Sequence, residues 1–244
     1  MTFIPVFGTL ILRKIHDDSE RGFLLQAVQN PLKTEKVSKL LRTFAIPSII
    51  AMLVSALYNI VDQVFIGWSI GALGNAATNV AFPLTTICIA IALMFGIGGA
   101  SAFNLTMGEG DAKRAAFYVG NAISMLVICG VVLCIVAHLF LTPMLRFFGS
   151  TQDILGYART YTAITAFGFP FLILATGGGH LIRADGSPRF TMTCNLVGAI
   201  INLILDPIFI FGFHWGMAGA ALATIIGQIV SAALAVRYLM HYKT

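Results

Sequence analysis

Six long apolar runs constrain the fold of this chain more than any other feature. An α-helix needs about 20 mostly apolar residues to cross the ~30 Å hydrocarbon core of a bilayer, and each run is of that order. The side chains show no alternation of period two, which a membrane β-barrel would require. The sequence therefore predicts an all-α integral membrane protein with six transmembrane helices. The expected spans are 41–66, 77–103, 115–139, 158–182, 190–213 and 217–239.

Charged residues make up only 10% of the chain, against about 25% in a typical soluble domain. If six spans alternate in direction, 13 of the 15 Lys and Arg residues fall on one side, and only Arg146 and Arg159 on the other. Short cytoplasmic loops are enriched in basic residues. We therefore expect a multi-pass protein of a bacterial-type plasma membrane with both termini in the cytoplasm. The net charge of +5 then reflects topology, and no nucleic-acid partner is expected.

The N-terminal segment does not fit the six-span pattern. Its apolar stretch at 2–12 is too short to cross a bilayer, and it lacks the basic region and small-residue cleavage site of a signal peptide. We expect residues 1–29 to be an extension, either accessory or produced by an over-early start codon. No linker divides the remainder, so residues 30–244 are expected to form a single six-helix membrane lobe.

Two aspartates stand out because they are the only carboxylates inside the apolar runs. Asp62 lies in the first run and Asp206 in the fifth, each four residues after a polar side chain, Tyr58 and Asn202 respectively. Residues four apart share a helix face, so each aspartate belongs to a polar stripe. An ionisable group at the centre of a membrane helix costs about 2.5–3.5 kcal/mol even on insertion scales, and it usually marks an ion or substrate pathway.

Both aspartates also have a purely structural explanation. Asp62 lies close to Gly67 and could cap a helix hairpin, whereas Asp206 precedes Pro207 and could help to manage a kink. Apolar residues follow Asp62, and Asn202 adds a second polar group to the face of Asp206. These surroundings favour the functional interpretation for both.

Five short motifs are distributed from about Asn30 to the C-terminal end of the chain. They are Ala45-Ile46-Pro47, 58–67 (YNIVDQVFIG), 108–111 (GEGD), 183–189 (RADGSPR) and Asn202-x-x-x-Asp206-Pro207.

In this order and spacing, the motifs resemble the multidrug and toxic compound extrusion (MATE) transporters. The resemblance implies twelve helices in two six-helix lobes, around a cleft that opens alternately to the two sides of the membrane. Thr244 follows the first lobe, so we expect a transporter truncated there, with its second lobe missing or replaced by self-association.

The resemblance also implies a cation site inside this N-terminal lobe. Its expected ligands are Asp62, Asn202, Asp206 and Thr224, with Tyr58 and Tyr161 as supporting hydrogen-bond partners. Thr224 depends on the resemblance alone, because threonine commonly bonds the i−4 carbonyl of its own helix. Tyr58 could equally be a packing residue and Tyr161 an interfacial aromatic.

The residue types of this site suit either of two coupling ions. Sodium is a hard cation that prefers oxygen ligands, by analogy with hard divalent ions, and two carboxylates, an amide and a hydroxyl would supply them. Two carboxylates close together in a low dielectric also resist being ionised at once, so the pair could instead carry a proton. The sequence does not choose between sodium and proton, and the four ligands form a metal site only in the sodium case.

We therefore expect a cation-coupled efflux antiporter for amphipathic organic cations, working in the lipid bilayer without a cofactor. A lipid-linked oligosaccharide flippase of related architecture is an alternative, although basic cavity residues would suit it better. An intramembrane enzyme using Asp62 and Asp206 is another, but metalloprotease, nucleophile-elbow and Cys/His motifs are absent, so no catalytic residue is expected. The third alternative is a fragment that does not transport and only associates with other membrane proteins.

Overall fold

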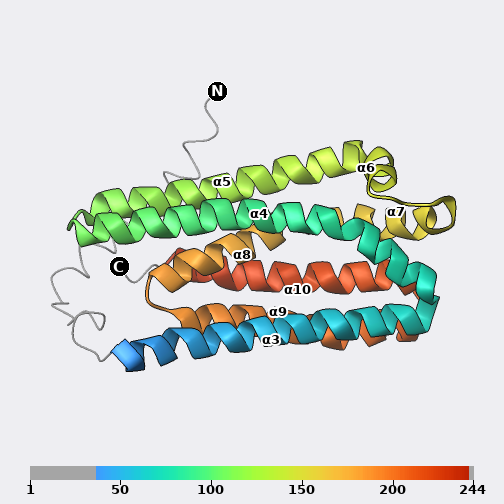
Figure 1. Ribbon diagram of the computed structural model, residues 1–244, viewed down its shortest axis with the longest axis horizontal. Coiled ribbons are helices and arrows are strands. Elements are labelled where there is room, and N and C mark those ends of the chain that lie inside the picture. Colours follow the sequence, from blue (N-terminus) through green and yellow to red (C-terminus); the bar gives the residue numbers. More distant parts are fainter. Residues whose placement is uncertain (1–36, 242–244) are drawn as a thin grey trace.

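The computed structural model describes residues 37–241, and the expected extension at 1–29 lies outside this range. All regular elements between these limits are helices, which confirms the expected all-α class. Figure 1 shows them arranged lengthwise in one bundle. They are α3 (Val37–Ile70), α4 (Ala72–Gly108), α5 (Ala112–Leu139), α6 (Leu141–Phe147), α7 (Gln152–Ala166), α8 (Phe169–Ala184), α9 (Pro188–Pro207), the π-helix η1 (Ile208–Gly212) and α10 (Gly216–Leu239).

Five of the described spans are single helical stretches that are long and apolar enough to cross a membrane. A sixth crossing is divided between α7 and α8, which are bent by 56° relative to one another. The expected span 158–182 therefore contains a break at Phe167–Gly168. Pro170 follows at once and has no N–H to continue the helical ladder. Gly168 also lies against the side chain of Gln228 in α10, where a larger residue would not fit.

The helices form layers that bring α3 and α9 together. In Figure 1, α4 and α5 lie along one side, α8 and α10 in the middle, and α3 and α9 along the other side. Helix α3 packs chiefly on α9 and makes few contacts with α4 beyond their shared turn. It is therefore held along one face, whereas ten large apolar side chains between Leu41 and Trp68 remain exposed.

Close backbone contact joins α4 to α8, the second half of the broken span. A Cβ atom added to Gly96 would lie 2.7 Å from both the Cα and the carbonyl oxygen of Gly177, so both helices need glycine there. Small residues allow such approaches in membranes, where apolar burial does not distinguish protein from lipid. The glycines at 96 and 177 therefore serve helix packing.

The two ends of the bundle differ in charge. Figure 1 places the start of α3, the end of α10 and the α4–α5 and α8–α9 turns at one end. Seven basic residues of the described chain belong to those segments, and two lie towards the other end, in α6 and α7. The first set is Lys39, Arg42, Lys113, Arg114, Arg183, Arg189 and Arg237, and the second is Arg146 and Arg159. The arrangement agrees with the expected asymmetry, and the orientation in the membrane stays a prediction.

Candidate cation site

The two membrane-embedded aspartates meet where α3 packs on α9. Asp62 is 6% exposed and Asp206 is completely buried. Their carboxylates are near enough to interact electrostatically. Helices α3 and α9 run in the same direction, and each aspartate lies within about two turns of its helix end. The fold therefore brings together two acidic groups that are 144 positions apart in the printed sequence.

Asn202 and Thr224 connect this pair to α10. The Asn202 amide nitrogen lies 3.3 Å from Oδ1 of Asp206 and 3.5 Å from the Thr224 hydroxyl. Turned about its terminal bond, the same amide would donate to Oδ2 of Asp206 at 3.2 Å and accept from the backbone N–H of Thr224 at 3.2 Å. In both orientations Asn202 bridges the carboxylate and α10. The Thr224 hydroxyl donates to the carbonyl oxygen of Ala220 at 3.0 Å, the i−4 bond that threonine commonly makes.

The two supporting tyrosines approach from opposite sides. Tyr58 lies one turn before Asp62 on α3 and interacts electrostatically with it. Tyr161 reaches in from α7, where its hydroxyl pairs with that of Thr224. The structure thus brings all six expected site residues together from four helices, and Tyr161 connects α7, the first half of the broken span, to the cluster.

The oxygen atoms in this cluster are of the kind that can bind a cation. Oδ1 of Asp62 is buried and makes no hydrogen bond, although a buried carboxylate oxygen normally has a partner. The facing groups are a second carboxylate, an amide and a hydroxyl, all of which can offer oxygen to a hard ion. Within residues 37–241, no three His, Cys, Asp or Glu side chains gather as a metal site. The set therefore suits sodium or a proton better than a transition metal.

The backbone next to Asp206 departs from regular α-geometry. Helix α9 ends at Pro207, and the chain continues as the π-helix η1, in which the Phe213 N–H donates to the Ile208 carbonyl at 2.9 Å. Pro207 lacks the N–H that an α-helix would use here. Short π segments often accompany functional sites. Pro207 is therefore followed by a change in backbone hydrogen bonding, and this change lies next to the polar cluster.

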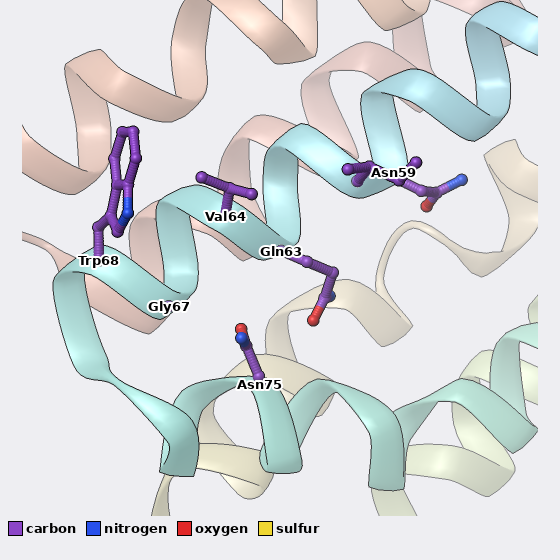
Figure 2. Close-up of a pocket in the computed structure, with 7 residues that line it drawn as sticks. Asn59, Gln63, Val64, Gly67, Trp68 and Asn75 are labelled. Atoms are coloured by element: carbon purple, nitrogen blue, oxygen red, sulfur yellow. The ribbon is translucent and has the colours of Figure 1, made fainter.

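Sequence reasoning missed a second polar feature on the other side of α3. An open hollow of about 510 Å³ lies between α3 and the start of α4, and Figure 2 shows its amide side chains approaching one another from the two helices. Its lining includes Asn59, Gln63, Val64, Gly67, Trp68 and Asn75. The 59, 63, 67 spacing places three of these residues on one helix face and could have revealed the feature.

Known transporters share this fold. The multidrug transporter DinF-BH, solved in complex with a dye, superposes with a TM-score of 0.80 at 38% identity, over 84% of this chain and 46% of that one. A multidrug resistance MATE family transporter of the MOP superfamily, solved in an outward-facing conformation, gives a TM-score of 0.76 at 27% identity. That match covers 81% of this chain and 44% of the other.

Sequence comparison leads to the same group. Multidrug export protein MepA of Staphylococcus aureus (strain MRSA252) is 28% identical over 204 residues, which are 84% of this chain and 45% of that protein. The MatE family model matches residues 47–208. The chain belongs to the MATE family.

As a MATE protein, the chain falls among transporters and not among enzymes, so the intramembrane-enzyme alternative is set aside. It is similar to one part of its relatives, because it spans about half the length of the curated proteins that it matches. The MATE match begins at Pro47 on α3 and ends just beyond Asp206, so it includes both site aspartates.

Proposed function

We propose that this MATE chain binds a coupling cation at Asp62, Asn202, Asp206 and Thr224, and that this binding drives multidrug efflux. The observation that carries the proposal is the buried, unpartnered Oδ1 of Asp62 beside the buried carboxylate of Asp206. Two buried carboxylates without a cation would leave charge in a low dielectric, at a cost of several kcal/mol. Sodium would neutralise the pair by coordination, and a proton by covalent attachment to one oxygen.

Coupling follows if the cation prefers one arrangement of the helices and the substrate another. The cluster draws on α3, α7, α9 and α10, so an ion bound there acts on both strongly packed and weakly packed helices. Helix α3 is the least constrained of the four within residues 37–241, since many of its large apolar side chains are exposed there. We expect cation binding to fix the position of α3 against α9, and cation loss to free it.

The proposed substrates are amphipathic organic cations. S. aureus MepA is named a multidrug export protein, and DinF-BH is described as a multidrug transporter. The exposed side of α3 offers apolar and aromatic surface, and Asp62, buried on the opposite face of the same helix, supplies a negative charge within the lobe that would attract cations. We further propose that the protein works in a plasma membrane with cytoplasmic termini, and that a second lobe or a second copy completes the substrate cleft.

Cation-dependent stability of the purified chain in detergent tests this function. Sodium chloride is titrated against choline chloride at constant ionic strength and pH, and the unfolding temperature is recorded. A ligand at ten times its dissociation constant stabilises the native state by about 1.4 kcal/mol. Asp62→Asn and Asp206→Asn should abolish this response. Asp153→Asn is the matched control, because Asp153 is exposed at the start of α7.

The same variants separate the two ions. If the coupling ion is a proton, sodium has no effect and lowering the pH stabilises the wild-type chain more than the two site variants. The proposal is wrong if neither sodium nor pH produces a stabilisation that depends on Asp62 and Asp206.

A further inference from the structure

The hollow beside α3 places amide groups at an unusual depth. Asn59 lies twelve residues before Gly71, where α3 turns into α4. At 1.5 Å per residue this is about 18 Å, close to the middle of a ~30 Å hydrocarbon core. Asn59 is exposed and Gln63 half-buried at this depth. Asn59 donates to the Ser55 backbone carbonyl at 2.7 Å, and the Gln63 side-chain oxygen accepts from Thr78, so these two groups are satisfied within the wall. The Gln63 NH₂ group would still pay a desolvation cost against lipid tails, which favours a polar occupant or water beside it.

Hydrogen bonds within the wall fix which ends of the amides remain available. The Thr78 hydroxyl lies 3.1 Å from Oε1 of Gln63 and 2.9 Å from the backbone carbonyl oxygen of Asn75, and its one proton is shared between these two acceptors. The Gln63 oxygen is therefore occupied, and the Gln63 NH₂ group is left for another partner. Oδ1 of Asn75 is buried and has no hydrogen-bond partner. In Figure 2 the two side chains point towards each other's helix across the gap. The hollow therefore offers the Gln63 NH₂ group as a donor, and its wall holds one unsatisfied acceptor, Asn75 Oδ1, which a ligand reaches when the Asn75 side chain turns towards the gap.

Glycine and tryptophan shape the outer part of the hollow. A Cβ atom on Gly67 would lie 3.0 Å from the Asn75 amide nitrogen, so the absence of a side chain lets this amide approach α3. Trp68 is 75% exposed, and Figure 2 shows its ring standing up from the next position of α3. A flat ring system could lie against this indole while its polar edge reaches the two amides.

A small molecule matches this surface better than a packed helix does. Helix contacts in membranes favour small residues that let backbones approach, whereas Asn59, Gln63 and Trp68 project from α3. The volume of about 510 Å³ lies in the range of small-molecule pockets. The side chains that line the hollow are all uncharged. Its selectivity must therefore come from hydrogen bonding and shape.

We propose that this hollow is a substrate subsite for a flat ring carrying a neutral group that both donates and accepts a hydrogen bond, such as a lactam. The Gln63 NH₂ donates to the carbonyl of that group, the Asn75 Oδ1 accepts its N–H, and Trp68 covers the ring. The inference rests on the proposed function, because it names a feature of the exported compounds. The subsite would recognise a neutral group of the substrate through hydrogen bonds. It adds to the attraction of positive charge assigned to Asp62, which is buried on the α9 side of the same helix.

Tryptophan fluorescence tests the subsite directly. The chain has two tryptophans, so Trp215→Phe leaves Trp68 as the only one. The probes are 2-quinolinone, an aromatic lactam, and N-methyl-2-quinolinone, which keeps the ring and carbonyl but has no N–H. We expect 2-quinolinone to quench Trp68 saturably. The N-methyl compound should bind about tenfold more weakly, as for one lost hydrogen bond.

Variants of the wall locate the binding. In the Trp215→Phe background, Gln63→Leu and Asn75→Leu should each weaken 2-quinolinone binding about tenfold. Asn79→Leu is the matched control, because Asn79 is exposed one turn further along α4 and outside the lining. Unchanged affinity in both lining variants would overturn the proposal.

Comparison of the two probes uses one unaltered wall and therefore does not depend on how the variants fold. Equal affinities for the two probes, or quenching that never saturates, would equally overturn the subsite. The assay contains no ion gradient and does not involve Asp62 or Asp206. Its failure is therefore distinguishable from failure of the cation-dependent stabilisation.

Discussion

Individual polar contacts hold together the end of the bundle that carries most of the basic residues. Tyr238, near the end of α10, donates from its hydroxyl towards Oδ2 of Asp185 at 2.7 Å and Oγ of Ser187 at 2.6 Å. Asp185 and Ser187 lie in the turn between α8 and α9, and the Tyr238 ring lies 4.8 Å from that of Phe190. One side chain thus fastens the α8–α9 turn to the last helix.

Removal of this hydroxyl should destabilise the protein measurably. Tyr238→Phe keeps the ring and loses the hydrogen bond to buried Asp185, so we expect a loss of about 1–3 kcal/mol in the free energy of unfolding. The measurement is equilibrium unfolding in mixed detergent micelles. Tyr157→Phe is the control, because Tyr157 is 40% exposed and should change stability by less than about 0.5 kcal/mol. Equal effects of the two substitutions would contradict this role.

At this scale, the aspartates could be predicted from sequence but their neighbourhood only in part. A carboxylate in an apolar run is conspicuous without any structure, and the family resemblance adds Asn202 and Thr224. The position of Gln63 in the wall of the hollow was not evident, because an amide is tolerated in many positions and does not carry the charge that makes Asp62 conspicuous. The contact between Gln63 and Thr78 joins two different helices. Sequence spacing says nothing about such a contact.

At the scale of helices, two glycines of α4 have opposite roles. Gly96 is buried, and a Cβ atom there would meet the backbone of Gly177 at 2.7 Å. Gly98, two residues later, is exposed, and a Cβ atom there would meet nothing within 4 Å. The same substitution should therefore give opposite results at the two positions.

Gly96→Ala should lower the free energy of unfolding by about 1–3 kcal/mol, because α4 and α8 would have to separate. Gly98→Ala should leave it unchanged or raise it by up to about 1 kcal/mol, since alanine restricts the unfolded chain and favours helix. Unfolding in mixed micelles gives both values on one scale. A neutral Gly96→Ala would show that α4 and α8 do not depend on this contact.

The helices were predictable as elements, but their interruptions were not. Hydropathy places six crossings because it averages over about 20 residues, and this averaging conceals a two-residue break. Gly168 and Pro170 were visible in the printed sequence, yet both residues are tolerated inside membrane helices. At this bend of 56°, the side chain of Gln228 in α10 lies beside Gly168, a contact between helices that the sequence does not reveal.

At the scale of the whole molecule, the charge difference between the two ends predicts orientation. Cysteine labelling of intact cells with a membrane-impermeant maleimide tests it through Ala72→Cys and Lys113→Cys, two exposed positions at opposite ends of the bundle. We expect position 72 to react from outside, and position 113 to react only after permeabilisation, because basic ends stay in the cytoplasm. The unaltered chain, whose described cysteines are at most half-exposed, provides the background. Labelling of position 113 from outside, and of position 72 only after permeabilisation, would contradict the predicted orientation.

The loose attachment of α3 also has an evolutionary consequence. Much of its surface carries side chains that pack against no other part of the described chain, and exposed substitutions usually change stability by less than about 0.5 kcal/mol. Selection can therefore exchange residues on this face one at a time without unfolding the protein. The buried aspartate on the opposite face has no such freedom. Under the proposed function, a single helix thus combines a constrained cation-binding side with a side whose substrate contacts can change during evolution.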